Sequence, residues 1–266
     1  MSLRDRFPQL KGVILDMDGV LWKDTEPIGD LPFIFDNLTT LGLDYMAVTN
    51  NAMRTVEDYV IKFRSLGVEI DPYHIMGSAD ATALYLSRHF SRDLPLYVVG
   101  TDSLKARLMA EGFLIAPVEE KQRAGAVVVG LDHGLTYQKI ANAGLLIQAG
   151  VPFIASNTDA TFPMPDGLYP GAGTVVAAVM TAGGREPLVI GKPSPYMYLE
   201  ALNRMNLQPF EAMGIGDRLE TDIAGAQAAG CLSGLVLSGV TNPQQLQKWE
   251  PKPDIVAPDL TQLLYG

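Results

Sequence analysis

The chain has 266 residues, a formal net charge of −10, 47% hydrophobic residues and 19% charged residues. This length fits one elaborated domain or two smaller ones, and the composition excludes disordered and collagen-like proteins. The negative charge argues against nucleic acid and an anionic membrane surface as general partners.

The N-terminus and the cysteine content bear on the compartment. The opening residues, Met-Ser-Leu-Arg-Asp-Arg-Phe, lack the apolar segment of a signal peptide, and no later run is as long as a membrane span. The single cysteine, Cys231, cannot form an internal disulfide, and its apolar surroundings favour a place in the core. We therefore expect a cytoplasmic protein.

Residues 12–22, Gly-Val-Ile-Leu-Asp-Met-Asp-Gly-Val-Leu-Trp, read as a buried strand that ends in two carboxylates. Asp16 and Asp18 are two residues apart, so they leave the strand on the same side, and Gly19 then permits a sharp turn. The carboxyl ends of parallel strands are where open α/β sheets bind ligands. Two acids this close indicate a divalent metal, acid–base chemistry or both, although a polar strand end before a solvated turn would also explain them.

Strand and helix patterns alternate along the rest of the chain. Strands are expected over residues 44–50, 75–78, 95–100, 125–129, 151–155, 188–190, 212–217, 232–237 and 255–256. Helices are expected over residues 31–41, 55–66, 80–90, 103–110, 137–149, 174–180, 196–205, 222–229 and 244–249. A loop rich in proline and glycine occupies residues 157–173. The alternation predicts an α/β fold with a doubly wound, Rossmann-like parallel sheet.

Polar residues follow four of these strands, and parallel strands would bring the four ends to one crevice. The residues are Asp16 with Asp18, Thr49 with Asn50, Lys192, and Asp217 with Asp222. Each has a simpler reading, since Thr49 and Asn50 also form turns, Lys192 suits a surface and Asp222 suits a helix N-terminus. Their joint position favours a functional site.

This set suits the hydrolysis of a phosphate monoester, which is extremely slow without catalysis. Asp16 would be the nucleophile that forms an aspartyl-phosphate, and Asp18 would act as general acid and then as general base. Asp16, Asp217 and the backbone carbonyl of Asp18 would hold Mg²⁺ through oxygen ligands.

The remaining polar groups would bind the phosphoryl group. Lys192 would supply a fixed positive charge, and the Thr49 hydroxyl with nearby backbone N–H groups would hold phosphoryl oxygens. Asp222 would orient Lys192 or a metal-bound water.

Four motifs together resemble the haloacid dehalogenase superfamily of phosphatases, and more narrowly its NagD-like, class IIA branch. They are Asp16-Met17-Asp18-Gly19-Val20-Leu21-Trp22, Thr49-Asn50-Asn51, Gly191-Lys192-Pro193-Ser194-Pro195 and the stretch from Gly216 to Ile223, and they span most of the chain without a departure at a catalytic position. The resemblance implies the same roles and adds Asn51 to the phosphate-binding residues. It also implies a catalytic core over residues 1–90 and 187–266 with an inserted C2-type α/β cap over residues 91–186.

In such families the cap excludes water and selects the leaving group. Its specificity candidates here are Asn157, Asp159 and His133, although a lone histidine in a loop is more often a solvated bystander. Arg54 would contact substrate or simply open a helix. Caps of this type often pair, so a homodimer through the cap is expected.

We therefore expect a Mg²⁺-dependent phosphatase that acts on small phosphorylated metabolites. Nucleoside monophosphates, pyridoxal phosphate, glycerol or sugar phosphates and p-nitrophenyl phosphate all remain open as substrates.

Three alternative activities are less well supported by the residues. Dehalogenation would leave Asp18 without a task, because halide departure needs no acid. A phosphotransferase or phosphomutase would pass the group from Asp16 to a sugar. A non-catalytic nucleotide-binding module rests on Gly171-Ala172-Gly173, but Val176 replaces the third glycine of that fingerprint.

Overall fold

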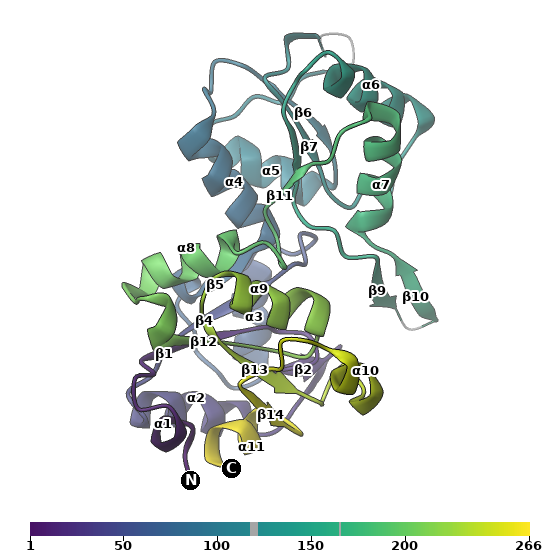
Figure 1. Cartoon of the computed structure of the whole chain (residues 1–266). Helices are drawn as coiled ribbons and strands as arrows, with labels where there is room; N and C mark the ends of the chain where they lie inside the picture. Colours follow the sequence, from purple (N-terminus) through teal and green to yellow (C-terminus); the bar gives the residue numbers. More distant parts are fainter. Residues whose placement is uncertain (118–121, 165) are drawn as a thin grey trace. The chain divides into compact units, whose positions relative to one another are not determined.

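The computed structural model describes residues 1–117, 122–164 and 166–266, which form two compact units (Figure 1). The first unit comprises Met1–Thr49, Val56–Met76 and Lys192–Gly266, and the second comprises Asn50–Thr55 and Gly77–Gly191. The expected core extends to residue 90, whereas residues 77–90 make their contacts with the second unit. The assignment of one unit as core and the other as cap stays a prediction.

The first unit is built on a six-stranded sheet in the order β14-β13-β12-β1-β4-β5. Its strands are β1 (Gly12–Leu15), β4 (Asp44–Thr49), β5 (Ile75–Gly77), β12 (Ala212–Gly216), β13 (Leu232–Val236) and β14 (Ile255–Ala257). β1 pairs in parallel with both neighbours, so that Leu15 lies opposite Ala47 and Ile215. All of β1 is buried, as a strand covered on both faces must be. The predicted α/β fold with a parallel sheet is confirmed.

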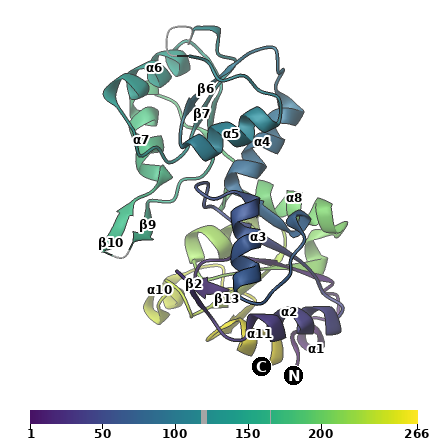
Figure 2. The same ribbon diagram turned by 180° about the vertical axis from the view of Figure 1, so that it is seen from behind.

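Helices cover both faces of this sheet (Figures 1 and 2). One face carries α1 (Leu3–Arg6), α2 (Leu31–Thr40), α3 (Val56–Ser65) and α11 (Leu260–Tyr265), and the opposite face carries α8 (Tyr196–Met205) and α9 (Ala224–Ala228). The short helix α10 (Pro243–Lys248) follows β13. Side-chain alternation separates the faces, because Val13 and Leu15 join the apolar cluster under α2, whereas Gly214 faces Tyr198 of α8.

The second unit has its own parallel sheet, in the order β11-β8-β7-β6. The strands are β6 (Leu96–Val99), β7 (Ala126–Val129), β8 (Phe153–Ala155) and β11 (Leu188–Val189). The helices are α4 (Ser78–His89), α5 (Asp102–Ala110), α6 (Tyr137–Gln148) and α7 (Ala172–Gly183). A separate apolar cluster that includes Val129, Ile147 and Val176 fills its interior.

Two expectations about this unit are wrong. The residues expected as a loop contain an antiparallel hairpin, β9 (Thr161–Met164) and β10 (Gly167–Pro170), because prolines and a glycine hide its strand pattern. The strand before Lys192 is β11, which pairs with β8 rather than with a strand of the first sheet. Lys192 therefore does not follow a strand of the sheet that carries Asp16.

The first unit also differs locally from expectation. A small hairpin, β2 (Trp22–Lys23) with β3 (Glu26–Pro27), follows β1, and α1 and α11 were not expected. A π-helical turn, Leu219–Ile223, precedes α9 where a regular helix from residue 222 is predicted.

Cys231 lies in the core, 7% exposed, and burial raises the pKa of its thiol to about 12. The thiol is thus protonated at neutral pH, which agrees with its expected packing role. Among the described residues, no helix combines the length and the hydropathy that crossing a bilayer requires.

Candidate active site

Asp16 and Asp18 lie just beyond the carboxyl end of β1. The backbone N–H of Asp16 still donates to the Ile215 carbonyl at 2.8 Å, so the sheet fixes the backbone beside this carboxylate. Asp18 is exposed, and Gly19 turns the chain with a φ of +88°. A Cβ on Gly19 would lie 2.6 Å from Asp217 Oδ2, so glycine permits the close approach of the two segments.

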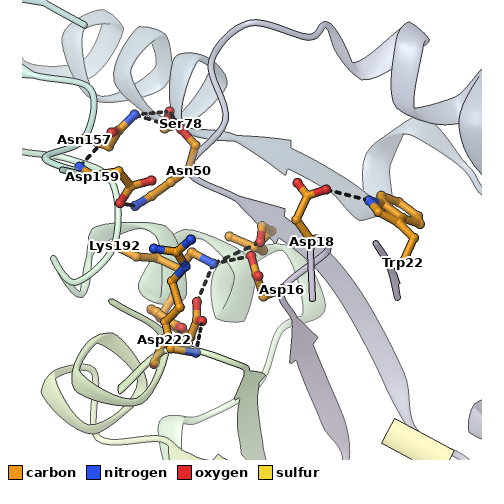
Figure 3. Close-up of polar contacts among 12 residues, drawn as sticks. Asp16, Asp18, Trp22, Asn50, Ser78, Asn157, Asp159, Lys192 and Asp222 are labelled. Carbon is orange, nitrogen blue, oxygen red and sulfur yellow. Dashed lines mark hydrogen bonds and ion pairs between the residues drawn. The ribbon is translucent and has the colours of Figure 1, made fainter. Parts of the chain in front are cut away.

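Lys192 joins two of the carboxylates. Its Nζ lies 2.5 Å from Asp16 Oδ1 and 2.6 Å from Asp222 Oδ1, and the residue is only 3% exposed (Figure 3). Burial alone would lower the pKa of Lys192, but the two carboxylates outweigh it and hold that pKa well above its usual value. The ammonium is therefore a permanent positive charge.

Asp222 is fixed from three directions. Oδ1 accepts from Lys192, Oδ2 accepts from the Arg218 N–H at 3.0 Å, and the backbone carbonyl accepts from the Tyr198 hydroxyl at 2.9 Å. The π-helical turn brings this residue back toward the end of β12, where a Cβ on Gly216 would lie 2.1 Å from Asp222 Cβ. Both carboxylate oxygens already have protein donors, which suits a residue that orients Lys192.

Asp217 has one carboxylate oxygen without a protein donor. Oδ2 accepts from the Val240 N–H at 2.7 Å, whereas Oδ1 is buried and no group among the described residues donates to it. Burial and the neighbouring Asp222 raise the pKa of Asp217 to about 6. A buried acceptor without a donor is costly unless a cation compensates it.

The carboxylates fit a divalent cation. Ligand atoms of Asp16, Asp217 and Asp222 lie within 4.8 Å of one another. Burial raises the pKa of Asp16 well above its usual value, Lys192 opposes this shift, and the other two carboxylates add to it. Hard oxygen ligands of this kind are the donor set that Mg²⁺ and Ca²⁺ bind, and a bound cation would favour the ionised carboxylates.

The residues predicted to bind phosphate divide between the two units. Thr49 ends β4 in the first unit, is 3% exposed and lies on the strand next to β1. Asn50, Asn51 and Arg54 belong by their contacts to the second unit. Asn51 Oδ1 accepts from the Met53 N–H at 2.9 Å, which shapes the turn after β4, and Arg54 is exposed.

Within the second unit, two of the cap candidates contact Asn50. Asn157 Nδ2 donates to the Asn50 carbonyl at 2.8 Å, and Asn50 Nδ2 donates to Asp159 Oδ1 at 2.9 Å (Figure 3). Ser78, to which the sequence assigns no role, donates to the same Asn50 carbonyl at 2.6 Å. His133 is exposed instead, with its ring 6.4 Å from that of Phe162 in β9.

Sequence reasoning also missed Trp22 and Tyr198. Trp22 Nε1 donates to Asp18 Oδ1 at 2.9 Å, and Tyr198 holds the Asp222 backbone. A buried indole N–H or phenol hydroxyl usually finds an acceptor, but the sequence gives no signal that these acceptors are Asp18 and Asp222.

Two family models match the chain. Residues 13–114 match the haloacid dehalogenase-like hydrolase model, and residues 189–263 match a HAD-hydrolase-like model. The chain is also 36% identical to phosphoglycolate phosphatase 2 of Arabidopsis thaliana, over 92% of this chain and 88% of that protein.

Solved structures agree over nearly the whole chain. NagD from E. coli K-12 superposes with a TM-score of 0.87 at 31% identity, covering 95% of this chain and 98% of that one. A glycerol phosphate phosphatase from Mycobacterium tuberculosis in complex with magnesium has a TM-score of 0.87 at 33% identity, covering 99% of this chain and 78% of that one. The names of the Arabidopsis and Mycobacterium relatives give different substrates, phosphoglycolate and glycerol phosphate.

Proposed function

Because the chain belongs to the NagD-like phosphatases of the haloacid dehalogenase-like hydrolases and is a phosphoric monoester hydrolase, we propose that it hydrolyses small phosphorylated metabolites through an aspartyl-phosphate on Asp16, with Mg²⁺ as cofactor. The observation that carries the proposal is the buried cluster of Asp16, Lys192, Asp217 and Asp222 in the first unit. The non-catalytic alternative is not supported, because the chain is a hydrolase.

In the first step an oxygen of the Asp16 carboxylate attacks phosphorus. The bond from phosphorus to the leaving oxygen breaks, and the Asp18 carboxyl gives that oxygen its proton, so the alcohol departs neutral. Lys192 offsets the negative charge of the phosphoryl oxygens. Asp222 holds the Lys192 ammonium in place.

In the second step the Asp18 carboxylate takes a proton from water. The resulting hydroxide attacks phosphorus, the bond to Asp16 breaks, and inorganic phosphate leaves. Asp16 is again a carboxylate and Asp18 is again protonated, so the atoms and protons balance over the cycle.

Asp16, Asp217 and the Asp18 backbone carbonyl would hold Mg²⁺. When bound, the cation supplies positive charge that offsets the repulsion between the anionic nucleophile and the anionic phosphate. The donorless Asp217 oxygen supports this ligand set, and the two protein donors on Asp222 support an indirect role for that residue.

The phosphoryl group would be bound by Thr49, Asn50, Asn51 and Arg54, and the second unit would act as the specificity cap. Asn157 and Asp159 are supported as cap residues by their contacts with Asn50. A homodimer through this unit is also proposed, and light scattering on purified protein tests it.

The direct test is release of p-nitrophenol from p-nitrophenyl phosphate, with Mg²⁺ and with EDTA. We expect metal-dependent turnover that the Asp16→Asn substitution abolishes and the Asp36→Asn substitution preserves, since Asp36 is exposed on α2. Acid quenching of the parent enzyme should trap a phosphorylated peptide that contains Asp16. Full turnover by Asp16→Asn would remove Asp16 as nucleophile.

A screen of phosphorylated metabolites then identifies the substrate. Adding a sugar or glycerol acceptor separates hydrolysis from transfer. If the phosphoryl group goes to the acceptor rather than to water, the enzyme is the phosphotransferase alternative.

A further inference from the structure

We propose that Trp22 is a positioning residue for the acid–base carboxyl of Asp18, and that its indole N–H directs the reactive proton to the other oxygen of that group. This inference rests on the proposed function. It assigns a task in the chemistry to an aromatic side chain that is otherwise part of the core.

The indole N–H makes a specific contact. Trp22 Nε1 donates to Asp18 Oδ1 at 2.9 Å, while Trp22 itself is fully buried and Asp18 is exposed (Figure 3). An indole nitrogen can only donate, so Oδ1 must keep a lone pair toward the ring. The carbonyl oxygen of a protonated carboxyl is a better acceptor than its hydroxyl, so the contact favours Oδ1 as the acceptor and leaves Oδ2 to carry the proton toward the leaving group.

The turn between the two residues holds this contact in register. The Gly19 N–H donates to the Trp22 carbonyl at 2.8 Å, and the Leu21 N–H donates to the Met17 carbonyl at 2.8 Å. Trp22 then enters β2, opposite Pro27 of β3. The β2–β3 hairpin thus fixes the direction from which the indole approaches Asp18.

The indole ring is held by α3 on its other sides. Phe63 packs edge-on with ring centroids 5.1 Å apart, Tyr59 stacks at 6.4 Å, and Lys62 Nζ lies 4.0 Å from the ring centre. Lys62 also donates to the Asp24 carbonyl at 2.8 Å, which ties the helix to the hairpin. A ring held this way cannot follow a moving carboxyl, so it restricts the carboxyl instead.

The chain contains a natural comparison in its second tryptophan. The buried Trp249 Nε1 has no hydrogen-bond partner among the described residues, whereas Trp22 Nε1 has the Asp18 carboxylate. Removing the N–H at position 249 therefore changes no hydrogen bond that the structure shows, which makes Trp249→Phe a matched control.

The test compares two leaving groups in the magnesium-loaded enzyme. An alkyl phosphate needs a proton on the departing oxygen, whereas 2,4-dinitrophenyl phosphate releases a stable anion that needs none. For Trp22→Phe we expect kcat/KM to fall about tenfold or more with the alkyl ester and less than twofold with the dinitrophenyl ester. Because Asp18 must still activate water, kcat for the dinitrophenyl ester should fall and a burst of dinitrophenol should appear.

A second variant separates the hydrogen bond from packing. Benzothienylalanine at position 22 keeps the bicyclic shape and replaces N–H with sulfur, so it should reproduce the selective loss. Phe63→Leu loosens the packing of the ring but keeps the N–H, so it should give the same selective loss to a smaller extent. Trp249→Phe should leave the ratio of kcat/KM between the two esters unchanged.

Asp18→Asn distinguishes failure of this inference from failure of the proposed function. It should show the same selective loss, but larger. If Asp18→Asn lowers kcat/KM equally for the two esters, the proposed role of Asp18 is overturned. If Asp18→Asn is selective but the benzothienylalanine protein keeps the parent ratio, Trp22 serves packing only and this inference is overturned.

Discussion

At the scale of single residues, the buried Asp217 Oδ1, which has no donor among the described residues, allows a direct test of the metal site. Asp217→Asn keeps the side-chain shape but removes a buried charge beside Asp222. In the parent protein, Mg²⁺ at a hundred times its Kd should stabilise the fold by about 2.7 kcal/mol. We expect Asp217→Asn to lose most of this gain, measured as the Mg²⁺-dependent shift in Tm by circular dichroism.

The matched control is again the exposed Asp36, whose replacement with Asn should leave the shift intact. An Asp217→Asn protein that Mg²⁺ stabilises as strongly as the parent would contradict the assignment and place the cation on other groups. Because the readout is folding, the result does not depend on turnover.

Residues differ in how far their neighbours could be predicted from sequence. Asp16 and Asp18 stand out because strand periodicity alone puts both on one side of a strand end. Lys192 was expected beside them for the wrong reason, since its preceding strand belongs to another sheet. The direction of the Trp22 indole depends on the packing of α3, which no local pattern encodes.

At the scale of elements, α8 supports the π-helical turn through one hydroxyl. Tyr198 is 2% exposed, and its hydroxyl is the donor that reaches the Asp222 carbonyl. Tyr198→Phe leaves this buried carbonyl without that donor, which should lower the free energy of unfolding by about 1–3 kcal/mol. Denaturant unfolding measures this change.

The same substitution should lower kcat more than it raises KM, because a displaced Asp222 no longer holds Lys192 against Asp16. Tyr137→Phe is the control, since Tyr137 is 86% exposed, and it should match the parent in both measurements. A Tyr198→Phe enzyme with parental kcat would show that the turn keeps its geometry without α8.

Elements that continue the alternation of strands and helices were predictable even when short, as β5, β14 and α10 show, whereas the two hairpins and the π-helical turn were not. The alternation of buried strands and amphipathic helices correctly predicts β1, β4 and β12 and the helices between them. The β9–β10 hairpin was not predicted, because its prolines and glycine are typical of a loop. The π-helical turn was not predicted, because its course depends on tertiary contacts of Asp222.

At the scale of the whole molecule, the two units have separate sheets and separate apolar clusters, and the carboxylate cluster lies wholly in the first. Such a chain need not unfold in one step. We expect two calorimetric transitions, and Mg²⁺ should raise the midpoint temperature of only one of them. Val176→Ala opens a cavity in the second unit and should lower the midpoint temperature of only the other transition.

A single transition whose midpoint temperature changes with both Mg²⁺ and Val176→Ala would contradict this expectation. It would show that the two units unfold together. Scanning calorimetry at several Mg²⁺ concentrations distinguishes the two cases. The alternation of strands and helices alone does not separate two units, and the inserted unit is expected from the family resemblance. The limits of the two units depend on contacts of residues 50–55 and 77–90 that no sequence pattern reveals.

The pairing of Gly12 with Ala212 has a consequence for the chain as it leaves the ribosome. All strands of the second sheet lie between Leu96 and Val189, so that sheet can close while β12 is still unsynthesised. β1 meanwhile has only β4 beside it and waits some two hundred residues for its other neighbour. The second sheet can thus form before the first is complete, and Asp16 is synthesised long before Lys192, Asp217 and Asp222.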